Sequence, residues 1–187
     1  MRTTIRIVLS LMPALLFLAA IHSTTLARLS LDQLVAASDA AARVRCAGAE
    51  SRWEGGSIWT VTSLGVVETL KGNLPRQITV RLPGGRVGHL TATVDGAPKF
   101  KPGDEAVMFL ERSRAGGFTV AGWVEGTFRI WRDPRTGREM VTQDSSAFAV
   151  FDTATRSFRA EGIRGMPMEI FRARIAAAVA HSEEKPR

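Results

Sequence analysis

Hydrophobic and polar residues alternate most clearly between residues 57 and 112. Ile78, Val80 and Leu82 alternate with polar neighbours, which predicts a strand with one buried face. Residues 106–110 read AVMFL and are apolar on both faces, which predicts a central strand. Gly- and Pro-containing segments separate the runs and indicate turns. The pattern therefore predicts a mainly β, largely antiparallel domain.

The longest run, residues 57–71, is apolar on both faces in places, and Gly65 lies at its centre. A strand that is apolar on both faces must bend so that different parts of it pack against different layers of the fold. We expect Gly65 to provide the bulge or coil at which it bends. A first strand over residues 43–53 precedes it across a turn at 54–56. Together these features predict a small OB-like antiparallel β-barrel, with an open sandwich as the alternative.

Helical signals flank this β region. Ser30 and Gln33 form a capping box, which predicts a short N-terminal helix to about residue 41. Pro167 starts a C-terminal helix whose apolar residues fall on one stripe. The stripe consists of Met168, Phe171, Ile175 and Val179. Residues 182–187 are polar, and we expect them to be a disordered tail.

Three further segments are read from their turn residues. Residues 133–137 carry Pro early and Gly late, which predicts the turn of a hairpin. A weaker hairpin is expected within residues 144–162. The glycine-rich segment 84–88 lacks the Lys-Ser/Thr pair and the following helix of a phosphate-binding loop, so it predicts a flexible loop.

Residues 1–27 have the layout of a secretory signal peptide: two arginines, an apolar run from Ile7 to Ile21, and small residues before Ala27. We expect cleavage after Ala27 and export to the periplasm or the extracellular space. The alternative, an uncleaved membrane anchor, is disfavoured because the run is short for a bilayer and contains Pro13. Residues 28–181 are then expected to form one domain.

Composition adds two constraints. Cys46 is the only cysteine, so no intrachain disulfide can form. It alternates with Val44 in the first predicted strand, which favours a buried core residue over a nucleophile. The formal net charge is +7, and the basic residues are spread along the chain. This distribution predicts a solvated surface with weak attraction to anionic lipids and polymers.

At residues 66–80, VVETLKGNLPRQITV, and 100–110, FKPGDEAVMFL, the chain resembles the netrin-like barrels of tissue metalloprotease inhibitors. It also resembles uncharacterised exported bacterial proteins with the same order of features. The resemblance covers residues 42–110 and implies an OB-like five-stranded barrel with helices outside. The inhibitors chelate zinc through an N-terminal cysteine, and Cys46 lies far inside this chain, so no inhibitory residue is assigned. Contact with an exported metalloprotease is kept as an alternative function.

Trp53, His89, Arg129 and Trp131 are the candidate ligand-binding residues. Tryptophans beside arginines offer the stacking and anion-binding groups that OB barrels use for oligonucleotides or sugars. Core packing is the alternative explanation for the tryptophans. Export argues against a nucleic-acid ligand.

Catalytic signals are weak. His89 lies in a glycine-rich segment, and a hydrolase would use it as a base with Asp95 or Glu105 behind it. A surface histidine is favoured, since no Ser or Cys nucleophile motif accompanies it. No Cys or His pair has metal-ligand spacing, and we expect no metal and no cofactor. The leading hypothesis is an exported, non-enzymatic binding module whose partner is an envelope protein or an anionic polymer.

Overall fold

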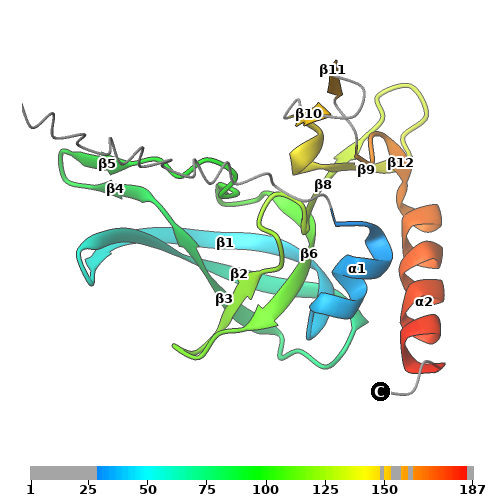
Figure 1. The fold of residues 1–187 in the computed structure, drawn as a ribbon, viewed down its shortest axis with the longest axis horizontal. Helices are drawn as coiled ribbons and strands as arrows, with labels where there is room; N and C mark the ends of the chain where they lie inside the picture. The colour runs from blue at the N-terminus through cyan, green and yellow to red at the C-terminus, as the bar shows by residue number, and fades with distance from the viewer. Residues whose placement is uncertain (1–28, 148–149, 153–156, 160–161, 185–187) are drawn as a thin grey trace, which may run out of the picture.

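The computed structural model describes residues 29–147, 150–152, 157–159 and 162–184, so the predicted signal peptide lies outside the described residues. The fold is mainly β, with one helix near the N-terminal side and one at the C-terminal end, as predicted (Figure 1). In chain order the elements are α1 (Leu31–Ala37), β1 (Ala40–Glu54), β2 (Ser57–Lys71), β3 (Gln77–Pro83), β4 (Gly85–Val87), β5 (Leu90–Ala92), β6 (Glu105–Arg112), β7 (Phe118–Val120), β8 (Thr127–Arg132), β9 (Glu139–Gln143), η1 (Asp144–Ala147), β10 (Val150–Asp152), β11 (Ser157–Arg159), β12 (Met166–Pro167) and α2 (Met168–Glu184).

Strands β1, β2, β3, β7 and β6 follow one another in the main sheet, and β6 pairs back with β1. The sheet therefore partly closes into a ring. The order β6-β1-β2-β3 is that of a Greek key. The pairings are antiparallel except between β3 and β7, which share a parallel bridge at Val80 and Phe118. This is the predicted OB-like barrel and not the alternative open sandwich.

The hairpin of β1 and β2 is the longest in the sheet, and its curvature comes from bulges. The register skips Ala47 in β1 and skips Val67 and Leu70 in β2. Each skipped residue is an extra residue on one strand, which bends and twists the ladder. The predicted bulge position, Gly65, is wrong, because Gly65 pairs in regular register with Arg45. The bending is distributed over both sides of the glycine.

Strand β6 is buried on both faces, as its apolar sequence predicts. Alternate residues of β6 join two clusters, one inside the ring and one between the sheet and the helices. In the outer cluster, Phe128 of β8 lies between Phe109 of β6 and Phe171 of α2, with ring centroids 5.7 and 4.7 Å away. Burying an aromatic side chain of this size contributes about 2–3 kcal/mol. The three rings therefore hold α2 against the sheet.

Helix α1 has the predicted capping box but ends earlier than predicted. The Ser30 hydroxyl accepts a hydrogen bond from the Gln33 amide, and the Gln33 side chain accepts one from the Ser30 amide. The helix ends at Ala37, and residues 40–42 belong to β1. These alanines are at most 2% exposed and pair with β6. Sheet pairing and burial therefore override the helix propensity of alanine.

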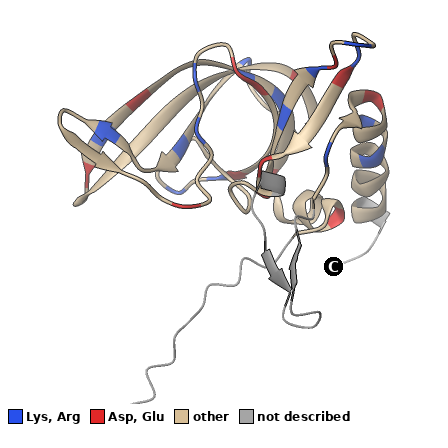
Figure 2. Cartoon of the chain, turned by 90° about the horizontal axis from the view of Figure 1, so that it is seen from above, with Lys and Arg blue, Asp and Glu red and all other residues tan. Residues whose placement is uncertain are grey.

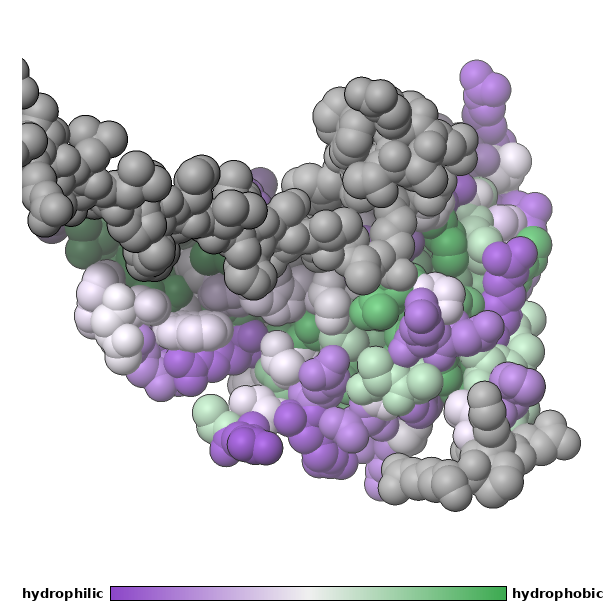
Figure 3. Space-filling model, viewed as in Figure 1, coloured by the Kyte–Doolittle hydropathy of each residue, from purple (hydrophilic) through white to green (hydrophobic). Residues whose placement is uncertain are grey.

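Helix α2 follows Pro167 and buries Met168, Phe171 and Ile175, whereas Val179 is only partly buried. The helix continues to Glu184, so the predicted disordered tail is wrong for residues 182–184. Here the Ser182 hydroxyl donates to the Val179 carbonyl, an interaction that is compatible with the helix. On the face seen in Figure 3, hydrophilic residues are interspersed with apolar ones around the helices.

The segment 84–88, predicted as a flexible loop, is mostly a strand. Residues 85–87 form β4, which pairs with β5 in a separate two-stranded sheet.

The predicted hairpins β8–β9 and β10–β11 are both present. Lys, Arg, Asp and Glu are spread over strands and helices, in agreement with the sequence (Figure 2). Neither helix in the described part of the chain is long and apolar enough to cross a bilayer.

Candidate ligand-binding site

The structure divides the four candidate residues into two groups. Trp53 is the second-last residue of β1, near the tip of the β1–β2 hairpin, and His89 lies in the turn between β4 and β5. Both tips lie at the end of the barrel opposite the helices (Figure 1). Arg129 and Trp131 instead come from β8 and line one pocket, which neither Trp53 nor His89 lines. Of the four candidates, Arg129 and Trp131 are therefore the pair that the fold brings together.

This pocket is open to solvent and has a volume of about 500 Å³. Its walls come from β1, β6, β8 and β9, which are consecutive in the sheet. Directly paired residues of neighbouring strands share a face, so Arg43, Arg45, Glu105, Arg132 and Glu139 project from one face of the sheet, whereas Arg129 and Trp131 project from the other. We call it the Trp131 pocket, and its charged and aromatic residues are Arg43, Arg45, Asp104, Glu105, Arg129, Trp131, Arg132 and Glu139.

Among the described residues of the pocket, three arginines share two glutamates. The Arg43 guanidinium lies 2.5 Å from Glu105 and 2.8 Å from Glu139. Arg45 also binds Glu105, and Arg132 lies 3.6 Å from Glu139. The five groups carry three positive and two negative charges, so the cluster has an excess of one positive charge.

The pKa shifts in this cluster follow from the same contacts. The hydrogen bond to Glu139 raises the pKa of Arg43, burial opposes this, and Glu105 adds to the increase. The hydrogen bond from Arg43 is also the main reason that the pKa of Glu139 is lowered. Burial would raise the pKa of Glu105, but hydrogen bonds from Arg43 and Arg45 outweigh it and lower this pKa. Arg43, Glu105 and Glu139 are therefore all charged at neutral pH.

The two predicted residues are held in place by their neighbours. The Arg129 guanidinium makes hydrogen bonds of 2.9 to 3.0 Å to the Asp144 carboxylate, and its central carbon lies 4.1 Å from the centroid of the Phe100 ring. The Trp131 indole nitrogen donates to the Thr142 hydroxyl at 3.1 Å. The Trp131 side chain is nevertheless exposed, at 42%. The indole is thus both oriented and accessible to a ligand.

The arrangement is suited to binding an anion that also has a flat apolar face. The side chains of Arg45 and Arg132 are 64% and 68% exposed. Arg45 already donates to Glu105 through Nε and Nη2, and Arg132 donates to the Gly137 carbonyl through Nη1, so the remaining N–H groups of these guanidinium groups are the donors left for a carboxylate, sulfate or phosphate. The indole of Trp131 provides the stacking surface. Across residues 29–147, 150–152, 157–159 and 162–184, no group of three or more His, Cys, Asp or Glu side chains could hold a metal ion.

His89 and Cys46, the two residues considered as catalytic groups, do not line the Trp131 pocket. His89 is exposed, and Glu105, one of the acids expected behind it, is bound by Arg43 and Arg45 instead. Cys46 is 2% exposed, as predicted, and burial raises the pKa of its thiol. A buried thiol of raised pKa is a poor nucleophile.

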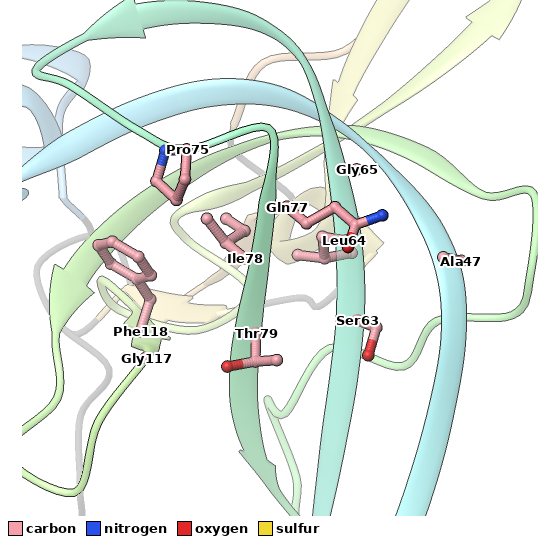
Figure 4. Close-up of a pocket in the computed structure, with 10 residues that line it drawn as sticks. All are labelled: Ala47, Ser63, Leu64, Gly65, Pro75, Gln77, Ile78, Thr79, Gly117 and Phe118. Atoms are coloured by element: carbon pink, nitrogen blue, oxygen red, sulfur yellow. The ribbon is translucent and has the colours of Figure 1, made fainter.

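A second pocket, of about 490 Å³, lies where β2, β3 and the start of β7 meet (Figure 4). The apolar side chains of Leu64, Ile78 and Phe118 line it, together with small residues such as Gly65 and Gly117. Sequence reasoning did not identify this pocket, because these residues carry no chemical signal and are brought together only when β7 joins β3.

Sequence reasoning also did not connect Arg43, Arg45, Glu105 and Glu139 with the Trp131 pocket. One signal was available: Arg43 and Arg45 are two residues apart on a strand and must project from the same face. Their acidic partners had no comparable signal, since Glu139 is 96 residues from Arg43.

The sequence matches no protein-family model, and it matches no curated protein. The netrin-like resemblance accordingly stays a prediction.

Proposed function

We propose that the protein is an exported, non-enzymatic binding module that binds an anionic polymer at the Trp131 pocket. The observation that carries this proposal is that the exposed Trp131 lines the same pocket as a cluster in which arginines outnumber glutamates by one. An indole and solvent-exposed guanidinium groups are the groups that recognise a charged sugar ring. Export follows from the signal-peptide layout of residues 1–27.

A polymer suits the open shape of the pocket better than a small enclosed ligand. Arg132 lies at the end of β8, and Arg135 and Arg138 are exposed along the β8–β9 turn, where Arg138 also pairs with Glu169. Repeated anionic groups on one chain can contact these residues and the pocket at the same time. Each contact is individually weak because exposed charges are screened by salt. Binding is therefore expected to depend on several contacts and on ionic strength.

The test is a titration of the purified protein with polygalacturonate, followed by tryptophan fluorescence, with neutral dextran as the control polymer. Polygalacturonate is expected to change the fluorescence at low salt and to bind less tightly as salt increases. Trp131→Ala should weaken binding at least tenfold. Trp53→Ala removes another exposed tryptophan, which lies outside the pocket, and should leave the affinity unchanged.

Equal binding by the two tryptophan variants would refute the proposal, as would equal binding of dextran and polygalacturonate. A protein recovered from envelope extract equally well by wild type and Trp131→Ala would point to a different surface and a different partner. Arg45→Gln combined with Arg132→Gln should lower the affinity for polygalacturonate and reduce its salt dependence.

A further inference from the structure

The pocket of about 490 Å³ at β2 and β3 is the second site that we consider, and we call it the Gly65 pocket. Its buried residues, Leu64, Ile78 and Phe118, belong to the cluster inside the ring. Gly65 and Gln77 pair directly across β2 and β3 and lie on the opposite, outer face, where Gln77 is exposed. The part of the pocket that a ligand can reach is therefore the outer face around Gly65.

No feature of the fold requires glycine at position 65. Gly65 pairs in regular register with Arg45 and Gln77, so the bends of the hairpin come from the bulges elsewhere. Its φ lies outside the range that favours glycine, and an added Cβ atom would meet only the Arg45 carbonyl oxygen, at 3.9 Å. Glycine inside a strand usually serves a bulge, a bend or the close approach of another group to the backbone. The close approach is the role that remains for Gly65.

The side chains around Gly65 leave its backbone accessible. Ala47 and Ser63, which line the same pocket, are small and exposed. The Gln77 side chain extends from β3 toward β2 (Figure 4). Since Arg45, Gly65 and Gln77 form one cross-strand row, a flat group can lie on the backbone of Gly65 between two longer side chains.

Arg45 supplies the one positive charge beside this surface. None of the described residues that line the Gly65 pocket is charged. The Arg45 side chain is 64% exposed and donates to Glu105 through Nε and Nη2, which leaves its other N–H groups as donors. A guanidinium group binds carboxylates and also packs on aromatic rings. An aromatic ring placed over a strand glycine covers the backbone, as aromatic side chains do within sheets.

We propose that the Gly65 pocket binds a small aromatic carboxylate, with its ring flat on the Gly65 backbone and its carboxylate on Arg45. The Gln77 amide can hydrogen-bond a polar substituent of the ring. The volume of the pocket suits one or two fused rings, since small-molecule sites occupy about 300–1,000 Å³. Arg45 also lines the Trp131 pocket, so the two sites are neighbours. The aromatic site goes beyond the proposed binding of an anionic polymer and does not depend on it.

The test is a nuclear magnetic resonance titration of the labelled protein with naphthoate. A ring stacked on Gly65 is expected to move the signals of its α protons upfield through the ring current, and to shift those of Ser63 and Gln77. Cyclohexanecarboxylate carries the same charge without a flat ring and should bind several-fold more weakly. Arg45→Gln should weaken the binding of naphthoate and leave that of uncharged naphthamide unchanged.

Gly65→Val places a branched side chain where the ring would lie. We expect this variant to raise Tm, because valine favours strands, and to weaken naphthoate binding by about tenfold or more. Gly48→Val is the matched control. Gly48 pairs with Ser63 on the same face, has no atom within 4 Å of an added Cβ and does not line the pocket. The control should bind naphthoate as wild type does.

The proposal is overturned if naphthoate at about 10 mM leaves the Gly65 signals unchanged, or if Gly65→Val binds it as tightly as Gly48→Val. Shifts confined to the Trp131 pocket would also overturn it. Polygalacturonate tests the proposed function separately. Gly65→Val should retain polygalacturonate binding, whereas Trp131→Ala should lose it and still bind naphthoate.

Discussion

Glu105 joins β6 to β1 through two arginines, and its replacement by glutamine tests the cluster described above. The side chains of Arg43 and Glu105 are only 13% and 16% exposed, so water screens their interaction weakly. Glu105→Gln keeps the shape of the side chain and removes its charge. Arg43 then retains Glu139 as its charged partner, while Arg45 loses the carboxylate that binds it.

We expect Glu105→Gln to lower the free energy of unfolding by about 2–3 kcal/mol near neutral pH. Breaking a fully buried ion pair costs about 3–5 kcal/mol. The loss is smaller here because Glu139 still neutralises Arg43, and because the exposed pair with Arg45 contributes at most about 1 kcal/mol. Glu50→Gln on β1 changes an exposed glutamate in the same way and should change stability by less than about 0.5 kcal/mol.

The effect of Glu105→Gln depends on pH with a defined sign. The pKa of Glu105 is lower in the folded protein than its ordinary value of 4.5. Its charge therefore stabilises the folded state above that ordinary value, and this contribution is lost as the pH falls through the lower, folded-state pKa. The difference between wild type and variant should be largest near neutral pH and shrink below about pH 4.5.

Urea denaturation of wild type, Glu105→Gln and Glu50→Gln, repeated across this pH range, measures the effect. Two results would refute the reasoning. One is a loss at neutral pH no larger than that of the Glu50 control. The other is a difference that stays constant down to the pH at which Glu105 is protonated in the folded protein.

Three further variants or measurements test the packing. Phe171→Ala should cost about 3–5 kcal/mol by urea denaturation because the ring is fully buried against Phe128, whereas Ile170→Ala at an exposed position should cost less than about 0.5 kcal/mol. Gly126→Ala would place a Cβ 2.1 Å from a backbone oxygen and should lower Tm, with a cost of about 1–3 kcal/mol or more, whereas Gly48→Ala has no atom within 4 Å and should be tolerated. The Cys46 thiol should react with a disulfide reagent only slowly until urea unfolds the protein; rapid labelling of the native protein would contradict its burial.

Local patterns in the sequence were sufficient to predict most of the fold. The run AVMFL predicts a strand buried on both faces, and β6 is that strand. The capping box at Ser30 predicts the start of α1, but not its end, since residues 40–42 become a strand only through pairing with β6. Gly65 illustrates the same limit, because the position of a bulge depends on the partner strand as much as on its own residues.

The candidate site was less predictable than the fold. Arg129 and Trp131 are two residues apart in β8, so a single run of sequence identifies both. Glu139 and Arg43 meet because β8 and β9 extend the sheet beyond β6, an arrangement that no local pattern contains.

The burial of β6 on both faces also affects how the chain reaches its native state. Before the ring closes, this strand is a continuous stretch of five apolar residues with high β propensity, the kind of segment that associates between chains. Charged residues stand at both of its ends, with Glu105 before it and Glu111 and Arg112 after it. Such flanking charges oppose intermolecular stacking. We therefore expect Glu105 to oppose association of the unfolded chain, and in the folded protein its carboxylate joins β6 to β1 through Arg43 and Arg45.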